Sequence, residues 1–264
     1  MIKYETIDIE KEKVVATIWL NRPDIRNAFN GIMIEELTNA FEELGTDSSV
    51  RLIILRGRGK AFCAGADLNW MRQAKDDSRE VNYRESLKLS ECFFKIYTCE
   101  KPVITCVHGA STGGANGLVA ASDIALCADD TVFSLSEVKI GLVPSVVSPY
   151  IIKRIGEFPA RELMLTARRF YGIEAAGRGL VNRSFPAEEV EQELAMLVEQ
   201  LIEGGPEALG IIKRLIFDVC NNLTICNSVG KTAGIIADIR TSEEAQEGMS
   251  AYLEKRKPKW ITEQ

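Results

Sequence analysis

One acidic residue, Glu137, stands in a mostly apolar segment, and no other acid occurs between Asp130 and Glu157. A carboxyl group in apolar surroundings is desolvated when it ionises, so we expect its pKa to rise. Such a group can give and take a proton near neutral pH. Upstream, the small residues at 109–117 let backbone N–H groups approach a ligand closely. Together the two features indicate proton transfer beside an oxyanion that backbone donors stabilise.

A second segment of small residues, 62–68, follows a predicted strand and precedes a predicted helix, which Asp67 can cap. By composition alone, this segment and residues 109–117 each favour a tight turn without a ligand. Residues 109–117 form neither a P-loop, because the Gly-Lys-Ser/Thr ending is missing, nor a dinucleotide-binding fingerprint. A functional interpretation therefore depends on both segments considered together.

The elements that must position these segments alternate between strands and helices as far as Pro144. Strands are predicted at residues 14–20, 52–55, 102–107 and 124–127, and helices at 34–44, 87–97 and 117–121. The polar residues 73–84 are expected to form a loop. After Pro149 the pattern is mainly helical, and it ends in a predicted helix at 242–255 with Ser242 as its N-cap. The pattern predicts an α/β core followed by a helical C-terminal extension.

Composition excludes several classes of protein. The chain has 264 residues, 46% of them hydrophobic, and a net charge of −6, so it lacks the overall basic charge of a nucleic-acid-binding protein. The single histidine argues against a histidine-rich metal site and against a Ser-His-Asp triad. The most apolar stretch, residues 103–128, contains four glycines and is a poor membrane span. Seven scattered cysteines without a CxxC pair, and an acidic N-terminus without a secretory signal, favour a cytoplasmic protein.

Five motifs in order over nearly the whole chain resemble those of the enoyl-CoA hydratase/isomerase (crotonase) family. They are Asn21-Arg22-Pro23 with Arg26-Asn27-Ala28, then Phe62 to Asp67, Gly113-Gly114 followed by Ser122-Asp123-Ile124, Glu137 with Gly141 and Pro144, and Glu247-Gly248 through Tyr252, Lys255-Arg256, Pro258 and Trp260. The resemblance implies an α/β fold with a crotonase-like spiral of ββα units. It implies a core at 1–195 that holds a CoA thioester site, and a helical region at 196–264 for trimerisation and CoA contact.

The same resemblance implies roles for individual residues. Glu137 would be the catalytic acid and base, and the N–H groups of Ala66 and Gly114 would form the oxyanion hole. Trp70, Gly117 and Ser145 are candidates for the acyl pocket. Residues that would bind CoA are Arg26, Ala64, Asp67 and Leu68, together with Tyr252 and Lys255, which tend to act from a neighbouring subunit. CoA would be part of the substrate, no separate cofactor or metal is expected, and the assembly would be a homotrimer or a hexamer made of two trimers.

The chain departs from the family pattern at one position. Hydratases of the family use two glutamates, and the first should fall at position 117, where this chain has Gly117. The separation from Glu137, 137 − 117 = 20, matches the family, so the register is correct. A single glutamate can return to C2 the proton that it takes from water. It can also shuttle a proton between C4 and C2, which is enoyl-CoA isomerisation.

Three functions remain open. The leading one is hydration of a branched or carboxylated 2-enoyl-CoA such as 3-methylglutaconyl-CoA in leucine degradation. Residues 64–71 and 135–150 look like those of the bacterial methylglutaconyl-CoA hydratase-type branch. The second is a delta-3, delta-2 enoyl-CoA isomerase that uses Glu137 alone. The third is an inactive CoA-binding or scaffold protein, which Gly117 suggests but the retained Glu137 opposes.

Overall fold

The structure, a computed structural model, describes residues 4–262, so the outermost residues of the predicted regions 1–195 and 196–264 lie outside it. Six strands form the larger sheet in the order β1-β2-β3-β4-β6-β9. Only the β1–β2 pair is antiparallel within this sheet. The strands are β1 (Ile7–Glu12), β2 (Val15–Leu20), β3 (Leu52–Gly57), β4 (Val103–Val107), β6 (Ile124–Ala128) and β9 (Arg183–Phe185).

Alternate residues along these strands face two separate apolar layers. On β3, Ile53 and Leu55 join the main core with helices α1 (Gly31–Thr46) and α3 (Arg79–Thr98). Leu52 and Ile54 point to the other face, which α8 (Val190–Glu203) covers. Burying one such side chain stabilises the fold by about 1.5–3 kcal/mol. The buried two-sided sheet explains why the strands read as continuous apolar runs in the sequence.

A smaller sheet leads the chain into the glycine turn at 113–114 and into the segment that carries Glu137. Its order is β5-β7-β8, with β5 (Ala110–Thr112), β7 (Val132–Ser134) and β8 (Phe170–Tyr171). Strand β5 leads through the glycine turn into α4 (Ala115–Ala121). Strand β7, its parallel neighbour, leads into the short 3-10 helix η2 (Glu137–Ile140). Because β5 and β7 lie side by side, the glycine turn and Glu137 emerge at the same edge of the sheet.

The predicted loop at residues 73–84 is wrong, because this stretch belongs to two helices. Asp67 caps α2 (Leu68–Asp76) by accepting a hydrogen bond from the Asn69 N–H at 2.7 Å. Ser78 caps α3 by accepting one from the Val81 N–H at 3.3 Å. A local cap at each N-terminus thus stabilises helices that expose mostly polar side chains. The remaining helices of the core are η1 (Pro23–Ile25), α5 (Ser148–Ile155), α6 (Glu157–Thr166) and α7 (Gly172–Gly177).

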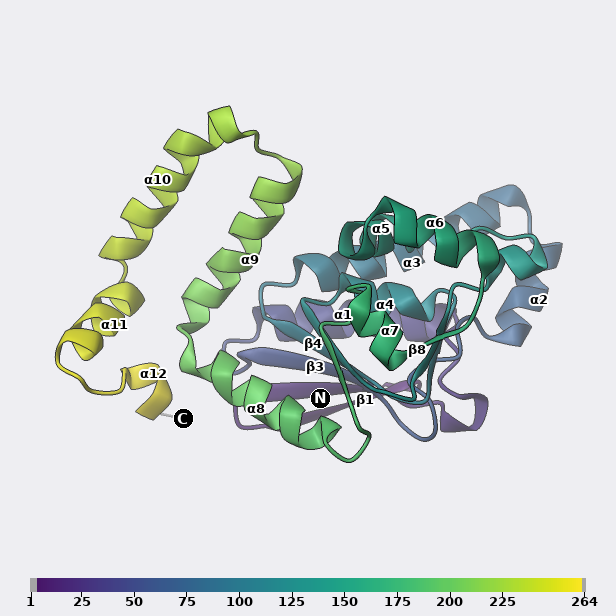
Figure 1. The fold of residues 1–264 in the computed structure, drawn as a ribbon, viewed down its shortest axis with the longest axis horizontal. Helices are drawn as coiled ribbons and strands as arrows, with labels where there is room; N and C mark the ends of the chain where they lie inside the picture. Colours follow the sequence, from purple (N-terminus) through teal and green to yellow (C-terminus); the bar gives the residue numbers. More distant parts are fainter. Residues whose placement is uncertain (1–3, 263–264) are drawn as a thin grey trace.

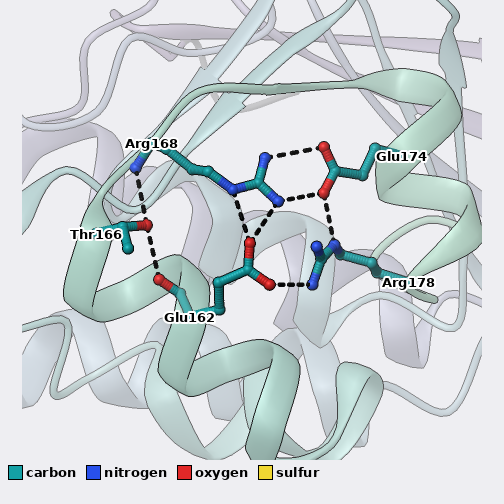
Figure 2. Close-up of polar contacts among 5 residues, drawn as sticks. All are labelled: Glu162, Thr166, Arg168, Glu174 and Arg178. Atoms are coloured by element: carbon teal, nitrogen blue, oxygen red, sulfur yellow. Dashed lines mark hydrogen bonds and ion pairs between the residues drawn. The ribbon is translucent and has the colours of Figure 1, made fainter.

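Two arginines and two glutamates fasten α6 to α7 (Figure 2). Arg168 bonds Glu162 through Nε at 2.9 Å and Glu174 through its terminal nitrogens, while Arg178 bonds both acids at 2.9 and 2.6 Å. The bond from Arg168, reinforced by Arg178 against a smaller effect of burial, lowers the pKa of Glu174 to about 2. Helix α6 packs against η2, so this network supports the segment that carries Glu137.

The C-terminal helices form an arm that extends away from the core (Figure 1). They are α9 (Pro206–Asn221), α10 (Ile225–Thr241), α11 (Glu243–Leu253) and α12 (Lys259–Thr262). Helix α9 contacts α3 through Phe217, whose ring lies 6.0 Å from that of Tyr97. The predicted boundary between residues 195 and 196 falls inside α8, which packs on the sheet.

At the junction of arm and core, the Arg51 guanidinium donates hydrogen bonds to three main-chain oxygens. One bond goes to Trp260 at 3.0 Å and one to Ile202 at 2.8 Å, and the third goes to Gly204. Arg51 immediately precedes β3, while its three acceptors lie in α12 and at the end of α8. One side chain of the core therefore holds both ends of the arm in place.

Two features are absent from residues 4–262. No helix in this range is both long and apolar enough to cross a membrane. Within the same range, no group of three or more histidine, cysteine, aspartate or glutamate side chains is arranged to hold a metal ion.

Candidate active site

The carboxyl group of Glu137 is placed by a turn that the local sequence favours. Glu137 opens η2, and Gly141 closes it in the left-handed conformation at φ 74°, with its N–H bonded to the main-chain oxygens of Glu137 and Val138. Burial raises the pKa of Glu137 above its ordinary value of 4.5. Among the described residues, its buried Oε2 has no hydrogen-bond partner. A buried carboxyl oxygen without a partner is rare in proteins and indicates a group kept for a ligand or for chemistry.

The glycine turn lies directly against this carboxyl group. A Cβ atom added to Gly113 would lie 3.3 Å from Glu137 Oε1. Gly113 has φ +56° and donates from its N–H to the oxygen of Ser134 at 2.8 Å. Any larger residue at 113 would both strain the turn and crowd the acid. The fit against Glu137 is thus a second reason for a small residue here, besides the close approach of a ligand.

The two segments of small residues are hydrogen-bonded to each other. Residues 62–68 are called the first segment below, and residues 109–117 the second. The Cys63 N–H donates to the Ala110 oxygen at 3.0 Å, and the Thr112 N–H donates to the Cys63 oxygen at 3.2 Å. Gly65, at φ +93°, approaches so closely that an added Cβ would lie 2.7 Å from the Thr112 oxygen. The segments form one unit although Gly65 and Thr112 lie 47 positions apart in the sequence, 112 − 65 = 47.

Two N–H groups of this unit donate no hydrogen bond to any of the residues that the structure describes. Phe29 pairs with the first segment by donating to the Gly65 oxygen and accepting from the Asp67 N–H, both at 2.9 Å, which leaves the N–H of Ala66 between them unbonded. The N–H of Gly114 also donates no hydrogen bond to any residue from 4 to 262. The Phe29 ring reaches Gly114 as well, since an added Cβ there would lie 2.7 Å from Phe29 Cζ. Unpaired backbone donors in a tightly built loop are the form that an oxyanion hole takes.

An amide side chain holds the glycine turn in shape. The fully buried Asn116 donates to the oxygens of Gly113 at 3.0 Å and Ser134 at 2.9 Å. It accepts a bond from the Ser111 hydroxyl at 3.0 Å. Nothing in the neighbouring sequence indicates that Asn116 has a structural role. The structure shows that it joins β5, the turn and β7 through all of its polar atoms.

Of the residues proposed to bind CoA, Ala64, Asp67 and Leu68 lie within the segment 62–68 and Arg26 lies beside it. The Ala64 N–H donates to the Arg26 oxygen at 2.9 Å, which sets the two loops side by side. Arg26 and Leu68 are exposed, the latter by 67%. Asp67 is buried, and its carboxylate is paired with Arg22 at 2.8 Å while it also caps α2. Burial opposes ionisation of Asp67, but the Asn69 N–H and Arg22 prevail and lower its pKa.

Tyr252 and Lys255 lie far from Glu137 within one chain. Tyr252 is 85% exposed on α11, and Lys255 is exposed just after that helix. The arm carries both residues away from η2, which sits against α6 on the core (Figure 1). A single chain therefore does not bring these two residues to the other proposed CoA contacts.

The three candidates for the acyl pocket differ in their surroundings. Trp70, on α2, is half-buried and meets Phe29 edge to face at 5.8 Å between ring centroids. Ser145 is exposed and donates from its N–H to the Val143 oxygen at 2.8 Å. Gly117 is buried, and the volume of a side chain there is already filled, because an added Cβ would lie 2.4 Å from Phe93 Cζ.

Glu137 also makes stability depend on pH. Well below pH 4.5 the carboxyl group is protonated in both the folded and the unfolded state. As the pH rises, the unfolded state loses its proton first, because its pKa is the lower one. The free energy of unfolding therefore falls until the pH has passed the folded pKa. Glu137→Gln removes this loss. We expect the variant to have a higher free energy of unfolding than the wild type at pH 8. Urea unfolding at pH 4.5 and 8 measures this, with the exposed Glu188→Gln as control. Equal stability of wild type and Glu137→Gln at pH 8 would contradict it.

Comparison with known proteins agrees with the class that fold and site define, an α/β protein with paired backbone donors beside one acid. Residues 10–263 match the family model for enoyl-CoA hydratase/isomerase. This chain belongs to the enoyl-CoA hydratase/isomerase (crotonase) family and is an enzyme of that family. The predicted crotonase-like α/β fold is thereby confirmed.

Individual relatives cover almost the whole chain. The crystal structure of an enoyl-CoA hydratase from Shewanella pealeana is 34% identical, with a TM-score of 0.94 over 98% of this chain and 97% of that one. An enoyl-CoA hydratase from Mycobacterium smegmatis is 31% identical, with a TM-score of 0.92 over 97% and 99%. A mitochondrial Delta(3,5)-Delta(2,4)-dienoyl-CoA isomerase of Pongo abelii is 30% identical over 98% of this chain and 82% of its own length. Both chemistries of the family thus occur among the relatives.

Proposed function

We propose that the protein is an enoyl-CoA hydratase in which Glu137 performs both proton transfers. The observation that carries this proposal is the buried, unpartnered Oε2 of Glu137 beside the glycine turn. The unpaired N–H groups of Ala66 and Gly114 support it, because they suit the oxygen of a thioester that becomes an enolate. Each such donor is typically worth about 2.7–4 kcal/mol of transition-state stabilisation.

The reaction balances with one carboxyl group. Ionised Glu137 takes a proton from water while the water oxygen bonds to C3 of the 2-enoyl thioester. The electrons of the double bond move to the thioester oxygen, which Ala66 and Gly114 hold. When the enolate collapses, Glu137 returns the proton to C2 and is ionised again. The raised pKa of Glu137 suits a group that must be base and acid in turn.

We further propose a branched or carboxylated acyl group such as 3-methylglutaconyl, as in leucine degradation, and a cytoplasmic location. The likeness of residues 64–71 and 135–150 to the methylglutaconyl-CoA hydratase-type branch supports this choice of substrate. CoA would be held by Arg26, Ala64, Asp67 and Leu68. The last three lie in the same segment, 62–68, as Ala66, and Arg26 accepts a hydrogen bond from the Ala64 N–H. CoA arrives as part of the substrate, and no separate cofactor takes part.

Isomerisation between 3-enoyl and 2-enoyl thioesters is the second candidate. One observation favours it: the place of a second acid, next to Gly117, is filled by Phe93. Moving a proton from C4 to C2 needs only one carboxyl group and no bound water. An isomerase is also among the relatives.

A spectrophotometric assay with three thioesters tests the proposal. Loss of the 2-enoyl absorbance with 3-methylglutaconyl-CoA, accompanied by the hydrated product in mass spectrometry, is the expected result. Gain of this absorbance from a 3-enoyl-CoA, without hydration of 3-methylglutaconyl-CoA or crotonyl-CoA, would replace the proposal with isomerisation. Binding of CoA without turnover of any of the three would contradict both.

We also propose a homotrimer, alone or paired into a hexamer, with Tyr252 and Lys255 reaching the CoA site of a neighbouring subunit. Support comes from the arm, which exposes apolar side chains that an isolated chain leaves in water. They include Ile212, Ile216, Val219, Ile225, Val229 and Ile236. Sedimentation equilibrium measures the assembly, and a monomer at micromolar concentration would contradict the proposal.

A further inference from the structure

The side of α4 that carries Gly117 is packed without space for a side chain. An added Cβ would lie 2.4 and 2.5 Å from the Phe93 ring and 2.8 Å from Val147 Cγ1. Real Cβ atoms essentially never approach neighbours this closely. Phe93 comes from α3 and Val147 immediately precedes α5, and α4 packs against both helices (Figure 1). With the Phe93 ring in this position, only glycine fits at residue 117.

The Phe93 ring is held in place by further aromatic rings. Phe93 is fully buried and meets Tyr150 edge to face at 6.0 Å between centroids. Tyr150 in turn meets Tyr97 at 5.4 Å, and Tyr97 meets Phe217 of the arm at 6.0 Å. A ring packed on several sides cannot swing aside to admit a new side chain without disturbing its neighbours. The contact with Gly117 is thus a fixed feature of the fold.

This contact lies close to the groups that the proposed reaction uses. Gly117 follows Gly114, the proposed oxyanion donor, by one turn, and its N–H bonds the Gly114 oxygen at 2.9 Å. Val147 lies on the chain that continues from Glu137 through the turn at Gly141. A carboxyl group on residue 117 would need the volume that the ring occupies. An acid forced against the ring would also be desolvated without a partner.

We propose that Phe93 is a specificity-determining residue that restricts the site to the single carboxyl group of Glu137. The ring excludes both a second acid and the water that this acid would hold. Simple linear 2-enoyl thioesters, which benefit from water held by a second acid, are then poor substrates. This proposal rests on the proposed function, since it explains why one carboxyl group must do all the proton transfer.

Activity of three variants on crotonyl-CoA provides the first test. We expect Gly117→Glu alone to give no gain in hydration, because the ring still fills the space. We expect Phe93→Ala with Gly117→Glu to hydrate crotonyl-CoA at least about 10-fold faster than Phe93→Ala with Gly117→Gln, which has the same volume and no acid. A gain of the same size in Gly117→Glu alone would overturn the proposal. So would equal rates in the two folded double variants.

A thermal unfolding cycle tests the contact without any turnover. Gly117→Ala is expected to lower Tm in the wild type, whereas alanine usually stabilises a helix interior relative to glycine. In the Phe93→Ala background the same change is expected to leave Tm unchanged or raise it. An equal loss of Tm in both backgrounds would overturn the proposal. A wild type that turns over no thioester would overturn the proposed function instead, and this cycle would still give its own result.

Discussion

Glu137→Gln is expected to lower kcat by about 10²–10⁴-fold on any thioester that the wild type turns over. Glutamine keeps the size and shape of the side chain but cannot take up and return a proton. The carboxyl oxygen that the change neutralises is the buried Oε2 without a partner. Because the change leaves the residues proposed to bind CoA unaltered, the affinity for CoA should stay within about threefold of the wild type.

Steady-state kinetics and calorimetric titration with CoA measure the two quantities. Glu188→Gln, the same change at an exposed position on the surface, is the matched control and should leave both unchanged. Wild-type kcat in Glu137→Gln would remove Glu137 from the chemistry. A parallel loss of CoA affinity would show instead that the carboxyl group maintains the site's structure.

Gly65→Ala is expected to lower kcat/KM by about 10²–10³-fold, the effect of losing one oxyanion donor. The added Cβ would lie 2.7 Å from the Thr112 oxygen, so the two loop segments must move apart. Gly65 directly precedes Ala66, and any shift moves that N–H away from its proposed position opposite Gly114. The loss should therefore fall on kcat, since the donor acts on charge that develops in the transition state.

Gly156→Ala separates this clash from backbone strain. Gly156 has φ +79°, close to the φ +93° of Gly65, but no atom lies within 4 Å of an added Cβ. We expect Gly156→Ala to cost about 1–3 kcal/mol of stability while kcat/KM stays near the wild-type value. Wild-type kinetics in Gly65→Ala would remove the first loop segment from the oxyanion hole. Equal kinetic losses in the two variants would assign the effect to backbone strain alone.

Local sequence patterns predicted the four central strands of the larger sheet, β2, β3, β4 and β6, and the apolar surroundings of Glu137. Apolar runs such as residues 52–55 are confirmed as β3, because a strand buried on both faces needs apolar side chains at every position. The lone acid among apolar residues indicated a raised pKa, in agreement with the burial that Glu137 has in the structure. Both features depend on residues close in sequence, which is why they could be predicted.

The residues that the sequence did not predict act across long separations. Phe29 bonds the first loop segment and also touches Gly114, 85 residues further on, 114 − 29 = 85. Phe93 lies among apolar helix positions, so nothing in its own segment distinguishes it from an ordinary core residue. Its contact with Gly117 arises only when α3 and α4 pack together. The helices at 73–84 were missed because their caps, rather than an apolar stripe, define them.

The hydrogen bonds that Arg51 makes to the arm differ in chemical kind from the contacts between α6 and α7. Arg51 bonds three main-chain oxygens, which neither titrate nor carry a net charge. The Arg168 and Arg178 contacts use carboxylates, which acid neutralises and salt screens. High salt should therefore weaken the contacts between α6 and α7, while the Arg51 hydrogen bonds at the base of the arm remain. Acid should do so only far below neutral pH, because the same arginines hold the pKa of Glu174 at about 2.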